Sequence, residues 1–172
     1  GMLSRSLEGV DRDALYRAVR VGLANQDGRA RGSLGSVYRN LSGDELAPIF
    51  PAIYQAVVEP APSGEMFADS IRVEGLRLMA KHHIEEGLAA CVQYTRDQNP
   101  WASEKRTPEL MDILLTYGTH AKSVIPQLVE IADYFENDEP DFPRQLMLRK
   151  AACVRETIQK IEAATETPEL VR

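Results

Sequence analysis

The sequence of 172 residues predicts an all-α fold, an α-solenoid (α-α superhelix) of about four antiparallel helix pairs. Apolar residues recur every three or four positions in most segments, as on one face of a helix. No segment alternates apolar and polar residues in the way that a half-buried strand does. Segments that suit the second helix of a pair begin at residues 29, 67, 108 and 144, so successive starts lie 38, 41 and 36 residues apart. A recurring spacing of this size is typical of stacked helical repeats, because one pair alone cannot bury its apolar face.

The first pair is expected over residues 11–41. Asp11 can cap the N–H groups that the first turn of a helix leaves unbonded, and turn-forming residues 25–28 end this helix. The second helix, over residues 29–41, contains Gly32 and Gly35. Glycine lowers helix propensity, but it also permits another element to approach closely.

The second pair is expected over residues 44–80, with helices at 44–58 and 67–80. Ser42 and Glu45 are three residues apart and form a capping box at its start. Pro48 and Pro51 lie inside the first apolar face, and proline removes a backbone hydrogen bond. This helix therefore either kinks at the prolines or begins at Pro48.

The third pair is expected over residues 84–117 and the fourth over 120–164, all within one domain of residues 1–172. The third pair has helices at 84–95 and 108–117, where Pro108 suits a first helical turn, and its junction near His82 also allows one long bent helix. Residues 96–106 form the longest non-periodic stretch and are expected to be a loop. The fourth pair has helices at 120–135 and 144–164, and the tail, 165–172, is expected to fray.

Two of these helices carry sequence features of a known repeat family. Residues 124–128, Val-Ile-Pro-Gln-Leu, resemble the proline-containing first helix of HEAT repeats, and residues 148–154, Leu-Arg-Lys-Ala-Ala-Cys-Val, resemble its second helix. Residues 46–49 with 69–72 are a weaker second instance. Residues 101–161 also resemble the C-terminal helical part of larger, uncharacterised bacterial HEAT-like proteins. The resemblance implies a scaffold and no known chemistry.

The composition limits the kinds of partner. The chain is 44% hydrophobic and 27% charged, with a formal net charge of -6. This acidity argues against binding to a phosphate backbone, so no nucleic-acid partner is expected; Arg29, Arg31 and Arg39 are the nearest approach to a basic cluster. No run of 18 apolar residues occurs, so no membrane partner is expected, and the compartment stays open.

A noncatalytic protein-interaction or scaffold module is the function that this pattern favours. Trp101, the only tryptophan, lies in the predicted 96–106 loop, close to Lys105 and Arg106. Long loops are often functional, and Trp and Arg are frequent at binding hot spots, so these three residues are the predicted partner-binding residues. The alternative interpretation is that Trp101 fills the groove between two repeats; the two are compatible, since a half-buried tryptophan can do both.

No motif predicts catalysis, a cofactor or a metal. His82 and Glu86 are four residues apart and could share a helix face, but zinc needs three or four ligands; the acidic residues 136–141 lack EF-hand spacing. Two other function classes stay open: a helical enzyme domain with an inter-helix pocket, which needs histidines beside acids in a cleft, and a helical-repeat nucleic-acid binder. Because solenoid ends expose apolar faces, an end pair could also dock a second copy or an upstream domain.

Overall fold

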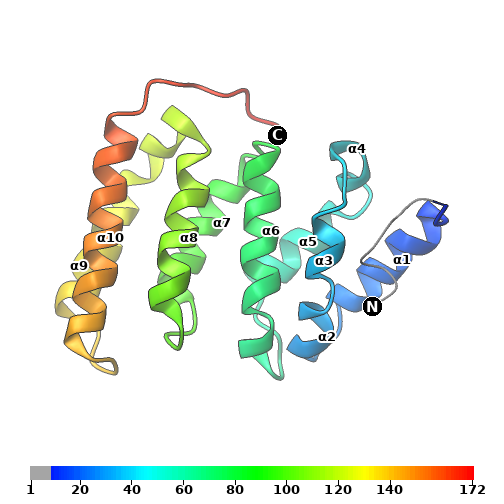
Figure 1. The fold of residues 1–172 in the computed structure, drawn as a ribbon, viewed down its shortest axis with the longest axis horizontal. Coiled ribbons are helices and arrows are strands. Elements are labelled where there is room, and N and C mark those ends of the chain that lie inside the picture. Colours follow the sequence, from blue (N-terminus) through cyan, green and yellow to red (C-terminus); the bar gives the residue numbers. More distant parts are fainter. Residues whose placement is uncertain (1–8) are drawn as a thin grey trace. The chain divides into compact units, whose positions relative to one another are not determined.

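The computed structural model describes residues 9–172, and throughout this part of the chain the secondary structure is helical, with no strand (Figure 1). The all-α prediction is therefore confirmed. The chain divides into two compact units, residues 1–78 and 79–172. Among the described residues, no helix combines the length and the hydrophobicity that a membrane-spanning segment requires. That the two units form one domain stays a prediction.

Unit 1 is built from short helices. They are α1 (Arg12–Leu23), α2 (Gly28–Gly32), α3 (Gly35–Tyr38), α4 (Gly43–Leu46), α5 (Phe50–Val58) and the 3-10 helix η1 (Glu65–Phe67), followed by α6 (Asp69–Lys81), which contains the boundary between the units. Asp11 caps α1 through its side chain, and the Ser42–Glu45 capping box is present at α4, as predicted.

Two long helices predicted in unit 1 are each interrupted. The helix expected over 29–41 is divided into α2 and α3, and the one expected over 44–58 is divided into α4 and α5. The backbone leaves the helical conformation at Ile49, with φ −120° and ψ −2°, and α5 then begins at Phe50 with Pro51 in its first turn, where a missing N–H costs no helical hydrogen bond. At α2, a Cβ on Gly32 would lie 2.4 Å from the carbonyl oxygen of Phe67, so the predicted close approach occurs there. Gly35 has no comparable neighbour.

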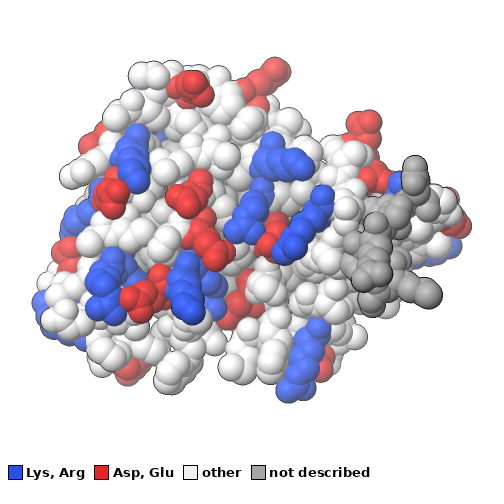
Figure 2. Space-filling view, in the orientation of Figure 1, with Lys and Arg blue, Asp and Glu red and all other residues white. Residues whose placement is uncertain are grey.

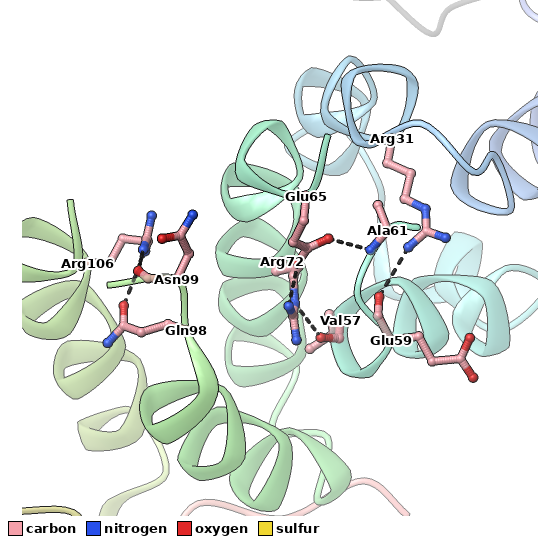
Figure 3. A network of polar contacts seen from close by, with 9 residues as sticks. All are labelled: Arg31, Val57, Glu59, Ala61, Glu65, Arg72, Gln98, Asn99 and Arg106. Carbon is pink, nitrogen blue, oxygen red and sulfur yellow. Dashed lines mark hydrogen bonds and ion pairs between the residues drawn. The ribbon is translucent and has the colours of Figure 1, made fainter. Parts of the chain in front are cut away.

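A buried arginine joins elements of unit 1 that are distant in sequence (Figure 3). Arg72 on α6 donates from Nε to the carbonyl oxygen of Val57 at 2.8 Å and from a terminal nitrogen to Glu65 at 2.6 Å. The other carboxylate oxygen of Glu65 accepts from the backbone N–H of Ala61. This network satisfies the last turn of α5 and the proline-rich connection to α6, where water has little access.

Unit 2 contains the longer helices. After α6 they are α7 (Glu86–Asp97), α8 (Ser103–Leu115), the 3-10 helix η2 (Gly118–Val124), α9 (Ile125–Asn137) and α10 (Arg144–Glu162). The helix α7 packs on α8 and on α9, and α10 packs on α9 and on α8. Figure 1 shows α8 and α10 side by side. The core of unit 2 contains fully buried residues, which include Leu110, Leu114, Tyr117, Leu128, Ala132, Ala151 and Val154.

Three predictions for unit 2 are corrected by the structure. The junction near His82 is a break rather than one bent helix, because His83 adopts a left-handed backbone with φ 51°. The helix expected to begin at Pro108 begins at Ser103, so Pro108 lies inside α8. The helix expected from residue 120 begins at Ile125, after η2.

The C-terminal tail is held to unit 2 rather than frayed. It leaves α10 and runs extended back to the segment that follows α6 (Figure 1). The backbone N–H of Thr119 donates to the carbonyl oxygen of Glu166 at 2.8 Å, and Val171 exchanges backbone hydrogen bonds of 2.8 and 2.9 Å with His83 and Glu85. Periodicity could not reveal this, because an extended segment held by backbone bonds needs no apolar repeat.

Candidate functional site

The segment between α7 and α8 is a short, well-bonded loop of residues 98–102. The predicted 96–106 loop is therefore wrong in length, because Asp97 and residues from Ser103 onward are helical. Asn99 accepts a hydrogen bond from the backbone N–H of Trp101 at 3.1 Å. Ala102 then adopts a left-handed backbone with φ 61° and starts α8. The turn directs the chain sharply into the helix and leaves Trp101 at its tip.

The side chain of Arg106 donates hydrogen bonds to several residues of this loop (Figure 3). Its Nε donates to the side-chain oxygen of Gln98 at 3.2 Å, and a terminal nitrogen donates to the carbonyl oxygens of Asn99 and of Trp101, the latter at 2.9 Å. Gln98 is buried and also donates to Thr107 Oγ1 at 3.0 Å. The half-buried Arg106 therefore positions the loop, whereas the sequence predicted it as a contact residue.

Trp101 is 73% exposed, so the interpretation that it fills a groove between helices is wrong. Its ring meets the ring of Phe142 edge to face, with 6.0 Å between centroids and 83° between planes. Phe142 lies between α9 and α10, and the sequence analysis missed it; its only signal is a lone aromatic residue in an acidic turn. Lys105 is exposed as well. We call Trp101, Lys105 and Phe142 the Trp101 surface.

Acidic and basic side chains alternate around the Trp101 surface. Glu104 on α8 accepts from Arg149 Nε on α10 at 2.7 Å, and over these helices Figure 2 shows Lys and Arg beside Asp and Glu. The three arginines that come nearest to a basic cluster in the sequence form no patch in unit 1 either: Arg31 is buried, Arg29 lies over the Phe67 ring at 4.5 Å, and Arg39 pairs with Glu74 at 3.5 Å. These arrangements give no continuous basic surface among the residues named.

We expect the fluorescence of Trp101 to be that of an indole in water. Because the chain has one tryptophan, the emission reports on this side chain alone. Its maximum should be at long wavelength, and acrylamide should quench it nearly as well as it quenches free tryptophan. A short-wavelength emission that acrylamide reaches only after unfolding would contradict the exposed placement.

Lys150 on α10 is a buried cation beneath this region. Its side chain lies over the Phe135 ring, with 4.3 Å from Nζ to the centroid, and the residue is 4% exposed. Burial lowers its pKa to about 8; the nearby Glu139 opposes this lowering of the pKa and the positive charge of Arg106 adds to it. Sequence reasoning could not find this buried lysine, since a lysine in an Arg-rich helix is usually solvated.

We expect Lys150→Met to stabilise the protein at pH 7, by on the order of 1 kcal/mol, because a charged ammonium in an apolar site opposes folding. The folded pKa is about 8 against 10.5 for the free side chain, so the unfolded chain binds more protons between these values. The destabilisation of the folded state by charged Lys150 is complete below about pH 8 and disappears toward pH 10.5. Denaturant unfolding at pH 7 and pH 10 measures it, with the exposed Lys122→Met as control. A destabilisation equal at both pH values would contradict the account.

The histidines and cysteines lie apart from the Trp101 surface. His82 belongs to the turn after α6 and Glu86 to α7, so the two lie on different elements and the shared helix face considered for a metal does not form. His120 contacts the carbonyl oxygen of Pro168 in the tail at 2.7 Å. Within residues 9–172, no three His, Cys, Asp or Glu side chains are placed to hold one metal ion. Cys91 is buried, and Cys153 is half-buried.

The comparisons with known proteins add no family. No family model matches the chain, and no curated protein or solved structure matches it. Function is therefore argued from this geometry.

Proposed function

We propose that this protein is a noncatalytic interaction module built on HEAT-like helical repeats, and that the Trp101 surface contacts a protein partner. The repeat proposal is supported by the order of packing in unit 2. There α7 and α9, the first helices of successive pairs, pack on each other, and so do the second helices α8 and α10. Stacked repeats produce this pattern, because each pair covers the apolar face of the next.

The exposed Trp101 on a rigid loop is the observation that carries the binding proposal. A tryptophan in water leaves a large apolar area exposed, and Trp is among the residues most enriched at binding hot spots. Phe142 contacts one edge of the ring, and Arg106 fixes the backbone on both sides of it. Binding would therefore require little ordering of the loop, which lowers the entropic cost of association.

The surroundings of Trp101 indicate a partner of mixed chemistry. The two rings offer an apolar contact, and the side chain of the nearby Lys105 has no ion pair or hydrogen bond within residues 9–172. An apolar side chain flanked by a carboxylate fits this combination. In this proposal Trp101 and Lys105 touch the partner, while Arg106 acts by holding the loop.

Capture from a lysate of the source cells tests the proposal. Wild type, Trp101→Ala and Met66→Ala are immobilised, and the retained proteins are quantified by mass spectrometry. Met66 is the matched control, because it is 59% exposed and lies in unit 1, outside the Trp101 surface. We expect at least one protein to be retained by wild type and Met66→Ala and lost with Trp101→Ala. The same proteins at the same level on all three would contradict the proposal.

A further inference from the structure

A small pocket in unit 1 contains two arginines that form no ion pair within residues 9–172. Its volume is about 140 Å³, and Arg20 of α1 and Arg31 of α2 both line it. Arg31 is 7% exposed and Arg20 is exposed, and neither forms an ion pair with any acid of residues 9–172, so Arg31 is a buried charge without a charged partner among these residues. Buried charges are nearly always paired, because removing an ion from water is costly.

The hydrogen bonds of these arginines leave donors unused. Arg31 Nε donates to the carbonyl oxygen of Asn25 at 2.7 Å, and one terminal nitrogen donates to that of Glu59 at 3.1 Å. Its second terminal nitrogen has no hydrogen bond within the described residues. Arg20 donates once, to the carbonyl oxygen of Pro48 at 2.7 Å. A guanidinium with free N–H groups matches an oxyanion geometrically.

The acid that lines this pocket does not pair with either arginine. Glu59 lines the pocket, but its side chain extends away from the Arg31 guanidinium in Figure 3. The Glu59 carboxylate instead accepts a hydrogen bond from Gln55 Nε2 at 3.0 Å. Neither guanidinium is therefore paired with the Glu59 carboxylate.

The other residues that line the pocket favour an anion with an apolar part. Leu23, Ala24, Ala52 and Ala56 provide apolar walls beside the arginines. At about 30 Å³ for a water-sized group, the volume suits a ligand of roughly five such groups. We propose that this pocket binds a small aliphatic carboxylate, with the carboxylate on Arg31 and Arg20 and the short chain against the alanines. This site is separate from the Trp101 surface and goes beyond the proposed function.

Titration of the full chain with butyrate, followed by amide NMR at constant ionic strength, tests this site. We expect saturable shifts for residues of α1, α2 and α5 that line the pocket, with millimolar affinity because so small a ligand has few contacts. Butyramide has the same shape without the charge, and it should bind at least about tenfold more weakly, since a charge-assisted hydrogen bond exceeds 1.4 kcal/mol. Inorganic phosphate is an anion without an apolar chain, so its binding tests whether the site accepts anions without using the apolar walls.

Matched variants locate the binding. Arg20→Gln should weaken butyrate binding about tenfold, whereas Arg17→Gln removes the same charge from α1 outside the pocket and should leave it unchanged. Ala52→Leu should fill the cavity and abolish the shifts. Arg31 is kept, because its two carbonyl contacts hold the fold. Absence of saturable shifts, equal binding of butyramide, tighter binding of phosphate, or equal effects of the two arginine variants would each overturn the proposal.

Discussion

Gly87→Ala is expected to lower the free energy of unfolding by about 2–3 kcal/mol, as overpacking of a filled core does. A Cβ at this position in α7 would lie 2.1 Å from Tyr117 Oη and 2.9 Å from Met79 Cβ. The Tyr117 ring is fully buried, and its hydroxyl donates to the carbonyl oxygen of Ile84 at 2.9 Å. The methyl group must displace this hydroxyl, which breaks its hydrogen bond to Ile84 and separates α7 from η2; the Ile84 carbonyl oxygen then keeps only the Gly87 N–H, at 3.1 Å, as its donor. Denaturant unfolding measures the change.

Two further variants separate this steric effect from a general intolerance of alanine. Gly35→Ala makes the same substitution in a helix where the nearest atom to the new methyl is Ile71 Cδ1 at 3.9 Å. It should be neutral or stabilise by about 0.5–1 kcal/mol, because alanine is the better helix former. Tyr117→Phe removes the clashing oxygen, so the double variant Gly87→Ala/Tyr117→Phe should be less destabilised than the sum of the two single changes. Strict additivity would show that the contact is not the cause.

Trp101→Ala is expected to weaken partner binding by 2 kcal/mol or more, about thirtyfold, as for a central aromatic hot spot. The side chain is 73% exposed, and its one aromatic contact is with Phe142, so the substitution should cost less than about 1 kcal/mol of stability. Affinity for the captured partner is measured by calorimetry, and stability by denaturant unfolding.

The separation of binding from stability is what distinguishes the two roles of Trp101. Met66→Ala shortens another exposed apolar side chain and should change neither affinity nor stability. Lys105→Met should weaken binding with a dependence on salt, because it removes only a charge from the edge of the surface. If Trp101→Ala lowers stability by several kcal/mol and leaves affinity unchanged, the side chain has a structural role.

The fold class could be predicted from the sequence because helical periodicity is a local property. Leu15, Val19 and Leu23 recur on one face and are all buried in α1. Helix boundaries were predicted less well, since they depend on partners elsewhere in the chain. The left-handed backbone at Ala102 starts α8 five residues before Pro108, and the Arg106 hydrogen bonds that accompany it cannot be read from spacing.

The candidate site was predicted in part. Trp101 and Lys105 could be named because a lone tryptophan beside a cation in a non-periodic segment is a visible signal. Phe142 lies 41 residues further along, and only the packing of α10 on α8 brings it to Trp101. The pocket at Arg31 was equally hidden, because an arginine in a glycine-rich turn gives no sign that it will be 7% exposed.

Fluorescence of Trp101 during titration with the captured partner tests the central claim most directly. The indole is the only tryptophan of this chain and is exposed, and selective excitation requires a partner without tryptophan or one labelled to remove its signal. We predict a saturable shift of the emission to shorter wavelength, with loss of acrylamide quenching at the same midpoint as calorimetric binding. Full binding by calorimetry with unchanged emission and quenching would place the interface elsewhere and contradict the account.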